Sequence, residues 1–397
     1  MTDSKLPVVR VQAQRHRRAA HGHPWLYSNE IVMDAPTKAL ASGAMARFVA
    51  HDGSLIGTGS FNPHCLIAGR IFTRAPLEVV DQDWLYRKLQ SALTLRQRCV
   101  AEPHYRLVHA EADGLPGLII DRFGDHLGVQ LNTAGMQLLW PELQAALLAL
   151  LQPASIVLHN DSAVRTLEGL ERTVTVAHGE VAPPIAVREN GLTYYADPVG
   201  GQKTGWYFDQ RDNHALVARY ASGQRVLDLF CHAGGFGLAA ARAGAAAVVG
   251  VDSSQPALAM AEKAAAFNGL AAQCVWQRAD VFEELERRIA AAEKFDIVVA
   301  DPPPFVKSRK DLATGARGYR KLAKMAARVT ATDGLLFIAS CSHNMELPLF
   351  IEEVARGLHE ARRSGRILYS LGAAPDHPVH PHLPESAYLK GLLVRLD

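Results

Sequence analysis

The carboxyl-terminal half of the chain has the most regular pattern of hydrophobic positions. From about Val187, runs of consecutive apolar residues alternate with segments in which apolar residues recur every three or four positions. Uninterrupted apolar runs indicate strands that are buried on both faces, and their alternation with helices is typical of a doubly wound parallel sheet. The predicted strands are RVLDLF, AVVGVD, CVWQRAD, FDIVVADPPP, GLLFIASCS and RILYSL, with the closing LKGLLVRL as one more that could run antiparallel.

The amino-terminal part predicts shorter strands. PVVRVQ, ARFVAHDGSLIGTGSFN and LIAGRIFTR are punctuated by glycines, which is typical of a small, strongly curved β domain. A helix is predicted between Leu77 and Val100, with Asp81 or Asp83 as its N-cap. Residues 103–185 then predict a strand-strand-helix-strand unit. We therefore expect an α/β protein with domain boundaries at 1–76, 77–185 and 186–397.

Composition fits a globular protein outside the membrane. The chain has 397 residues, of which 48% are hydrophobic and 21% charged. No apolar run approaches the roughly 20 residues of a membrane span, and the charged amino terminus does not resemble a secretory signal. The five cysteines form no CxxC pair, which indicates free thiols and no zinc site. We therefore expect a cytoplasmic protein without a bound metal.

Positive charge is concentrated in two segments, although the formal net charge is only +2. Residues 1–74 hold nine Lys and Arg against four acids, and residues 306–328 hold eight against one. Either cluster alone is equally typical of a solvated face. Together they favour a surface that contacts nucleic-acid phosphates.

The segment RVLDLFCHAGGFG predicts a strand, a glycine-rich turn and the start of a helix. This first crossover is where doubly wound sheets bind nucleotides. Asp228, Asp252 and Asp280 each could cap a helix, but acids on three successive strands suit adenosine recognition. The turn has neither the GxGxxG nor the GxxxxGK[ST] spacing, which favours S-adenosylmethionine (SAM) over NAD or ATP. The predicted cofactor residues are Asp228, Phe230, Gly234, Gly235, Asp252, Ser253, Asp280, Val281 and Asp301.

Two strand ends carry the candidate chemistry. DPPPF (301–305) closes the fourth strand of the predicted sheet, where Asp301 and nearby carbonyls could hydrogen-bond a flipped base. Cys341 closes the fifth. Carbon 5 of a pyrimidine is not nucleophilic, so its methylation needs a thiolate that first adds to carbon 6. Cys341 is therefore the candidate nucleophile and Asp301 its partner, against the alternative that Cys341 is a buried structural residue, as we expect of Cys231.

Several strings together resemble one family over nearly the whole chain. HPWLYSNEI, RLVHAEADGLPGLIIDRFGD, GQKTGWYFDQRDN, DLFCHAGGFG, DPPPF, SCSHNM and PDHPVHPHLPESAYLKGLLVRL are similar to segments of the ribosomal RNA large subunit methyltransferase I family. The resemblance implies a PUA domain, a central α+β domain and a class I SAM methyltransferase domain that methylates carbon 5 of a cytosine in 23S rRNA. It also implies that Cys341 is the nucleophile, that Asp301 contacts the cytosine ring, and that the loop with Lys203 and Arg211 covers the pocket.

Two departures bear on the mechanism. Related RNA cytosine-C5 enzymes carry a second cysteine where this chain has Pro304, so elimination of the thiol would need another base or water. Uracil-C5 enzymes usually have SCNP where this chain has SCSH, which favours cytosine.

The alternatives are methylation of a uracil carbon 5 or of a base nitrogen, as in guanine, with Cys341 incidental, or an RNA-binding assembly factor with little turnover. A methyltransferase without a nucleic-acid substrate would leave the two basic segments unexplained. The expected partner is 23S rRNA, naked or in an assembly intermediate, and the chain could form a homodimer. The predicted RNA or substrate contacts are Lys203, Arg211, Pro302, Phe305, Arg17, Arg18, Arg317 and Lys321.

Overall fold

The computed structural model of the protein describes residues 6–201 and 204–397, and contacts within the chain divide it into two units. The first comprises Met1–Ile185, Asp197–Trp206 and Pro375–Ser386, and the second comprises Ala186–Ala196, Tyr207–Ala374 and Ala387–Asp397. The predicted domain boundaries after residues 76 and 185 stay predictions.

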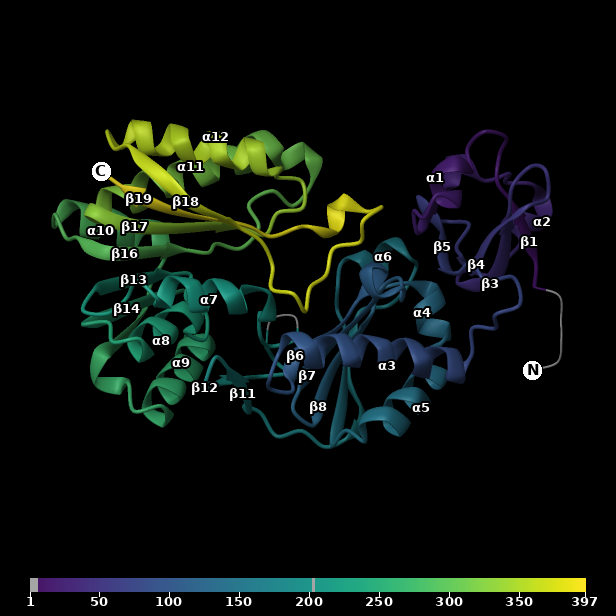
Figure 1. Ribbon diagram of the computed structural model, residues 1–397, viewed down its shortest axis with the longest axis horizontal. Coiled ribbons are helices and arrows are strands. Elements are labelled where there is room, and N and C mark those ends of the chain that lie inside the picture. Colours follow the sequence, from purple (N-terminus) through teal and green to yellow (C-terminus); the bar gives the residue numbers. More distant parts are fainter. Residues whose placement is uncertain (1–5, 202–203) are drawn as a thin grey trace. The chain divides into compact units, whose positions relative to one another are not determined.

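The amino-terminal elements form one curved five-stranded sheet, with the strand order β1-β3-β4-β5-β2 (Figure 1). A Cβ atom on Gly59 would lie 1.9 Å from the carbonyl oxygen of Arg70 on the neighbouring strand, so the close approach of the two strands requires glycine there. The predicted small β domain is therefore confirmed. Its elements are β1 (Val8–Arg10), α1 (Arg17–Ala20), β2 (Trp25–Tyr27), α2 (Ala35–Lys38), β3 (Ala44–Val49), β4 (Leu55–Phe61) and β5 (Ile67–Thr73).

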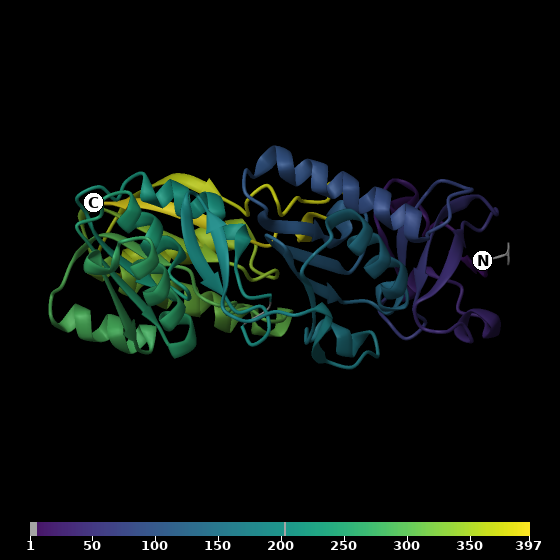
Figure 2. The same cartoon turned by 90° about the horizontal axis from the view of Figure 1, so that it is seen from below.

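The next elements form a second five-stranded sheet, of order β10-β9-β8-β7-β6, with α3 along one face, as Figure 2 shows (blue). Asp81 caps α3 by accepting a hydrogen bond from the N–H of Trp84 at 2.9 Å, as predicted. The elements are α3 (Gln82–Cys99), β6 (His104–His109), β7 (Leu118–Phe123), β8 (His126–Leu131), α4 (Ala134–Leu138), α5 (Trp140–Leu151), β9 (Ser155–Asn160), α6 (Val164–Leu167) and β10 (Thr173–Gly179).

Three predictions for this part were wrong in detail. The stretch 105–131 forms three strands, because a tight turn through Gly124 (φ 66°) divides its second half. One long helix was expected after β8, but Pro141 at the start of α5 cannot donate the backbone hydrogen bond of a helix interior, and α4 ends before it. The edge strand β10 was missed because its first four side chains, from Thr173 to Val176, are all exposed and do not alternate between buried and exposed positions.

Arg70 ties the β domain to the second sheet within the first unit. Its guanidinium forms ion pairs with Glu111 at 3.2 Å and with Glu168 at 2.9 Å. Glu111 also accepts a hydrogen bond from the indole of Trp25 at 2.8 Å. All of these side chains are largely buried, so breaking one of them would leave an unpaired charge in a poorly hydrated contact.

The second unit is built on a seven-stranded sheet of order β15-β14-β13-β16-β17-β19-β18. All neighbouring strands from β15 to β17 are parallel, and β19 runs antiparallel to both of its neighbours, as the sequence predicted. The strands are β13 (Arg225–Leu229), β14 (Ala247–Asp252), β15 (Cys274–Arg278), β16 (Phe295–Ala300), β17 (Thr330–Ser340), β18 (Gly365–Leu371) and β19 (Lys390–Leu396).

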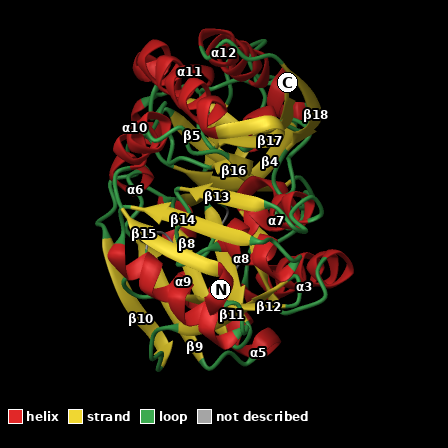
Figure 3. Cartoon of the chain, turned by 90° about the vertical axis from the view of Figure 1, so that its left-hand side faces the viewer, coloured by secondary structure: helices red, strands yellow, loops and turns green. Residues whose placement is uncertain are grey.

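Helices cover both faces of this sheet, so the predicted doubly wound fold is confirmed. Figure 3 shows α10, α11 and α12 on one side and α7, α8 and α9 on the other. A β-hairpin of β11 (Ile185–Glu189) and β12 (Leu192–Ala196) packs against α9. The helices are α7 (Arg211–Ala218), α8 (Gly235–Arg242), α9 (Gln255–Phe267), α10 (Val281–Ala290), α11 (Leu312–Val329) and α12 (Leu347–Glu360). Across the described residues, no helix has the length and apolar character needed to cross a membrane.

Candidate active site

The carboxyl ends of five parallel strands bring the candidate residues to one edge of the sheet. Asp252 is the last residue of β14, and Asp280, Asp301 and Cys341 follow β15, β16 and β17 within two residues. Asp228 lies near the end of β13, in the middle of the sheet. Because parallel strands end at the same edge, this edge is where the fold can bind a ligand.

The turn after β13 has an unusual backbone. Phe230 and His232 have positive φ angles of 60° and 48°, and Gly234 has a φ of 84°. Glycine is also required by packing, because a Cβ atom on Gly234 would lie 2.7 Å from Trp276 and one on Gly235 would lie 2.5 Å from His214. The conformation of the turn is therefore fixed by the side chains that pack against it, and α8 begins directly after it.

Asp228 is a buried acid under this turn, with 1% of its surface exposed. Its Oδ2 accepts a hydrogen bond from the N–H of Gly237 at 2.8 Å, whereas its Oδ1 is buried without a hydrogen-bond partner. Burial raises the pKa of Asp228 to about 7, although the bond from Gly237 opposes this shift. A buried carboxylate with an unused oxygen costs stability, and such a cost is typical of a functional site.

We expect Asp228→Asn to flatten the pH dependence of folding stability. The pKa of Asp228 is raised to about 7 in the folded chain, so its contribution to stability is present below the unfolded pKa and is lost as the pH rises through about 7. Three pKa units correspond to about 4 kcal/mol as an upper bound. Urea unfolding measures the free energy of unfolding at pH 5 and at pH 8. Between these two pH values, the free energy of unfolding of the variant should rise by a few kcal/mol relative to that of the parent. An equal pH slope in both proteins would contradict this account.

Asp252 holds the glycine turn in place. Its Oδ2 accepts a hydrogen bond from the N–H of His232 at 2.9 Å, and its Oδ1 accepts one from the N–H of Ser254 at 2.8 Å. The carboxylate is half-buried and keeps acceptor capacity, so it fits two ribose hydroxyls. The neighbouring Ser253 is exposed at the same strand end.

Asp280 caps α10, accepting hydrogen bonds from the N–H groups of Phe282 and Glu283 at 2.8 and 3.1 Å. It is exposed, whereas Val281 is buried in the core and Phe230 packs against that core. The predicted SAM fits these three acids. Asp228 has an oxygen without a partner, Asp252 can accept hydrogen bonds from ribose hydroxyls, and the carboxylate of Asp280 is exposed. The contacts of the individual residues with SAM stay predictions.

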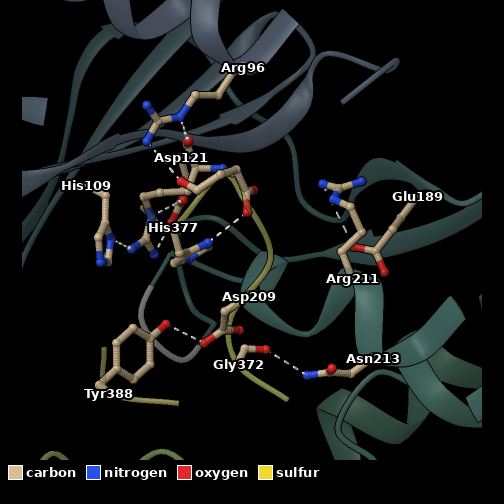
Figure 4. A network of polar contacts seen from close by, with 12 residues as sticks. Arg96, His109, Asp121, Glu189, Asp209, Arg211, Asn213, Gly372, His377 and Tyr388 are labelled. Carbon is tan, nitrogen blue, oxygen red and sulfur yellow. Dashed lines mark hydrogen bonds and ion pairs between the residues drawn. The ribbon is translucent and has the colours of Figure 1, made fainter. Parts of the chain in front are cut away.

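Asp301 is oriented by a chain of polar side chains from α7 and the turn before it. Gln210 donates a hydrogen bond from Nε2 to Oδ2 of Asp301 at 2.9 Å, and its Oε1 accepts one from Asn213 at 2.6 Å. Asn213 also donates to the carbonyl of Gly372 at 3.2 Å, which Figure 4 shows together with the hydrogen bond from Tyr388 to Asp209. Gln210 was not among the predicted residues, because nothing local links it to an acid 91 positions later.

Cys341 begins the loop after β17 and is half-buried. Its Sγ lies 3.9 Å from the carbonyl oxygen of Pro302, so the thiol is placed beside the DPPPF loop. The next residue, Ser342, fixes both loops. Its Oγ accepts a hydrogen bond from the N–H of Val306 at 3.1 Å and lies 2.9 Å from the hydroxyl of Tyr319. The sequence-predicted pair Asp301 and Cys341 is thus held on adjacent loops.

Tyr207 was missed in the sequence and connects the two halves of the site. Its ring lies edge-on to His232 in the glycine turn, with ring centroids 5.1 Å apart. Burial raises the pKa of Tyr207, and the charges of Asp209, Cys341 and Asp301 raise it further. Tyr207 therefore lies close to the residues of both the predicted cofactor site and the predicted nucleophile. Its signal was its place in the string GQKTGWYFDQRDN.

Some of the cations predicted to contact RNA are exposed, whereas others form ion pairs within the protein. Arg17, Arg317 and Lys321 are exposed, although the ammonium of Lys321 lies 4.0 Å from the carboxylate of Glu286 and over the ring of Phe282. Arg18 is half-buried, forms an ion pair with Glu30 at 2.9 Å and lies over the ring of Tyr27. Its charge is therefore partly neutralised within the β domain. Lys203 lies outside the described residues.

Arg211 is largely buried in the second unit. It is 5% exposed, its guanidinium lies 4.0 Å from the fully buried Glu189, and its predicted contact with the substrate stays a prediction. Phe305 likewise packs on Tyr319, with ring centroids 4.8 Å apart, and Pro302 is buried. For Phe305 and Pro302, a contact with a base stays a prediction.

The chain is similar to known proteins over nearly its whole length. Residues 9–74 match a PUA-like domain, and residues 145–395 match the S-adenosylmethionine-dependent methyltransferase family. The chain is 39% identical to ribosomal RNA large subunit methyltransferase I of Shewanella denitrificans, over 98% of this chain and 99% of that one. It is also 39% identical to the protein of that name from Aeromonas salmonicida, over 96% and 97% of the two chains.

Solved structures agree on the fold. A structure described as a SAM-dependent methyltransferase from Streptococcus mutans superposes with a TM-score of 0.82 at 20% identity, covering 98% of this chain and all of that one. A second, a methyltransferase complexed with SAH, gives a TM-score of 0.84 at 21% identity, with coverage of 98% and 100%. At these identities the likeness establishes the fold alone.

Proposed function

This chain belongs to the ribosomal RNA large subunit methyltransferase I family of SAM-dependent enzymes, and we propose that it methylates carbon 5 of a cytosine in 23S rRNA. The observation that carries the proposal is the position of Cys341. A half-buried thiol stands at the carboxyl end of β17, beside the DPPPF loop and on the same sheet edge as the acids of the predicted cofactor site. Methylation of a base nitrogen would need no thiol there.

The residues have distinct roles in the proposed reaction. The thiolate of Cys341 forms a bond to carbon 6 of the cytosine, which makes carbon 5 electron-rich. The carboxylate of Asp301, fixed by Gln210, accepts hydrogen bonds from the ring edge and holds the base against the thiol. SAM supplies the electrophilic methyl group. Afterwards the proton leaves carbon 5 to water or a base and the bond between sulfur and carbon 6 breaks, which restores the thiolate.

Product analysis tests this proposal. The full-length protein is incubated with methyl-labelled SAM and unmodified 23S rRNA, and the RNA is digested to nucleosides. We expect label in 5-methylcytidine. Label in 5-methyluridine would contradict the choice of base, and label in an N-methylated guanosine would contradict the role of the thiol. RNA binding without label would favour an assembly factor.

The proposed substrate is an rRNA segment with an unpaired target nucleotide, because an enzyme must extrude a base from a helix before acting on it. Naked rRNA or an early assembly intermediate would present such a segment, and we infer that the reaction takes place in the cytoplasm. The PUA-like domain would position the RNA through backbone contacts. Exposed cations on α11 and the loop before it, such as Lys307, Arg317 and Lys321, would hold the flanking strand.

We expect Arg17→Ala to weaken rRNA binding and to lower the slope of log K against log salt by about one, because one phosphate contact is lost. Arg18→Ala should have a smaller effect, since Arg18 is already paired with Glu30. Fluorescence anisotropy at several salt concentrations measures both quantities. The matched control is Arg219→Ala, an exposed arginine of the second unit, whose slope should equal that of the parent. Equal slopes for all four proteins would exclude Arg17 from the RNA interface.

A further inference from the structure

A buried lysine begins the strand that pairs with the end of β17, next to the proposed nucleophile. Lys390 is the first residue of β19 and pairs in register with Ser340, the residue before Cys341. It is 7% exposed, whereas lysines are rarely buried without a specific reason. The antiparallel pairing of β17 and β19 thus fixes a cation at the strand end that carries the thiol.

The hydrogen bonds of Lys390 hold the loop that begins with Cys341. Its Nζ donates to the carbonyl oxygen of Ser342 at 2.7 Å and to that of Tyr388 at 2.7 Å. Within residues 6–201 and 204–397, no carboxylate is among the groups that act on the charge of this ammonium. The two carbonyl groups therefore stabilise the charge of the Lys390 ammonium, but they offset only part of the free energy that its burial costs.

The titration of Lys390 responds to Cys341. Burial lowers the pKa of Lys390 to about 8, and the charge of Cys341 raises it. This influence is reciprocal, because a cation that is stabilised by a thiolate stabilises that thiolate by the same free energy. The ordinary pKa of a free cysteine is about 8.5, so a thiol that attacks a base at neutral pH needs such help.

We propose that Lys390 is a positioning residue that keeps Cys341 in its thiolate form and fixes the loop that carries it. The inference rests on the proposed function, in which the Cys341 thiolate attacks carbon 6. The thiol proton is released to solvent, and Lys390 keeps its own proton throughout. Its role is thus electrostatic, and it forms no bond to the substrate.

The other titratable groups around Cys341 do not supply this charge. Tyr207 and Tyr319 both have a raised pKa, chiefly through burial, and stay neutral at neutral pH. Asp301 is an acid on the adjacent loop, and its charge would oppose a thiolate. His343 is exposed in the same loop, where its ring stacks on that of Tyr388 with centroids 5.2 Å apart. Lys390 is the buried cation that contacts both neighbours of Cys341, through its register with Ser340 and its hydrogen bond to Ser342.

The test measures thiol ionisation directly, in the full-length protein without RNA or SAM. The rate of alkylation of Cys341 by iodoacetamide is followed from pH 5 to pH 10, in a Cys99→Ser background that removes the exposed cysteine. The remaining thiols are buried and react slowly, since burial raises the pKa of Cys65 to about 12, that of Cys274 to about 11, and that of Cys231 as well. Mass spectrometry confirms the site of alkylation.

We expect the midpoint for the parent to lie below that of a free cysteine, about 8.5. In Lys390→Met it should rise by about 1–2 pH units, as loss of a nearby opposite charge does, and in Lys390→Arg it should stay near the parent value. Equal midpoints in the parent and Lys390→Met would overturn the proposal, as would a parent midpoint at or above 8.5. The latter needs no variant, so the proposal stays testable if Lys390→Met does not fold.

The outcome is independent of the identity of the methylated base. If product analysis gave no 5-methylcytidine but Lys390→Met still raised the midpoint, the proposed function would fail while the electrostatic coupling held. If 5-methylcytidine formed but the midpoint did not move, the reverse would be true. A merely structural role of Lys390 would lower the unfolding temperature and leave the thiol midpoint of the folded protein unchanged.

Discussion

Cys341→Ala should abolish methyl transfer, with kcat lowered by at least about 10³-fold, while the affinities for SAM and RNA stay close to those of the parent. The reason is that carbon 5 of cytosine cannot accept a methyl group until carbon 6 carries a nucleophile. The thiol lies on the loop after β17 and is only half-buried, so its removal leaves the core of the second unit intact. Single-turnover methylation with labelled SAM measures the loss, and calorimetry measures the two affinities.

The matched control for this prediction is Cys99→Ser, which changes an exposed thiol of the first unit. Its activity should stay within about twofold of the parent, as expected for a surface substitution. If Cys341→Ala also kept its activity, the thiol would be structural and the reaction would have to occur on a base nitrogen. Loss of SAM binding in Cys341→Ala would instead indicate a disturbed sheet edge.

Asp301→Asn should lower kcat by about 10²–10⁴-fold, the range typical of a positioned acid or base. Asp301 follows β16 directly, its Oδ2 is fixed by Gln210, and the next residue, Pro302, lies against the thiol of Cys341. An amide of the same shape keeps the packing but replaces a carboxylate, which only accepts hydrogen bonds, by a weaker acceptor with a donor on one side, so it holds the ring edge less well. Steady-state kinetics with saturating SAM measure the change.

A control substitution at the other end of β16 shows whether loss of any acid near this strand lowers activity through the fold. Asp296 lies at the opposite end of β16, where its carboxylate accepts a hydrogen bond from the N–H of Arg225 at 2.8 Å. Asp296→Asn should therefore reduce stability slightly and leave kcat within about twofold of the parent. If Asp301→Asn behaved like Asp296→Asn, Asp301 would be no more than a turn residue.

The positions of Asp228, Asp252, Asp301 and Cys341 could be predicted because they depend on strand ends. Runs of apolar residues mark buried parallel strands, and parallel strands end at a common edge, so local pattern alone brings these residues together. The N-cap of α3 at Asp81 is likewise a local signal. Strands with strong periodicity were therefore recognised, whereas the exposed edge strand β10 was not.

Contacts between distant segments could not be predicted in this way. The hydrogen bond from Gln210 to Asp301 and the pairing of Lys390 beside Cys341 depend on the order of strands in the folded sheet. One signal was present for Lys390, a charge at the start of the largely apolar strand LKGLLVRL, since lysines are seldom buried without a role.

The number of Lys and Arg residues in a segment also overestimated how many of them are available to bind RNA. The basic segment 306–328 was expected to contribute to a surface that contacts phosphates, but Arg320 forms ion pairs with Glu353 on α12, the shortest at 2.7 Å, and so joins two helices. Arg18 is similarly committed to Glu30. Sequence gives the number of charges on a helix, whereas the partners of each charge depend on which helix packs against it.

The central claim is that Cys341 forms a covalent bond to carbon 6 of a cytosine. The most direct test is to incubate the protein with SAM and an rRNA substrate that contains 5-fluorocytosine, followed by denaturing electrophoresis. Fluorine at carbon 5 cannot leave as the proton does, so the covalent complex should persist. We expect a shifted band that is absent with Cys341→Ala. No shifted band, while methyl label still reaches ordinary rRNA, would contradict the thiolate mechanism.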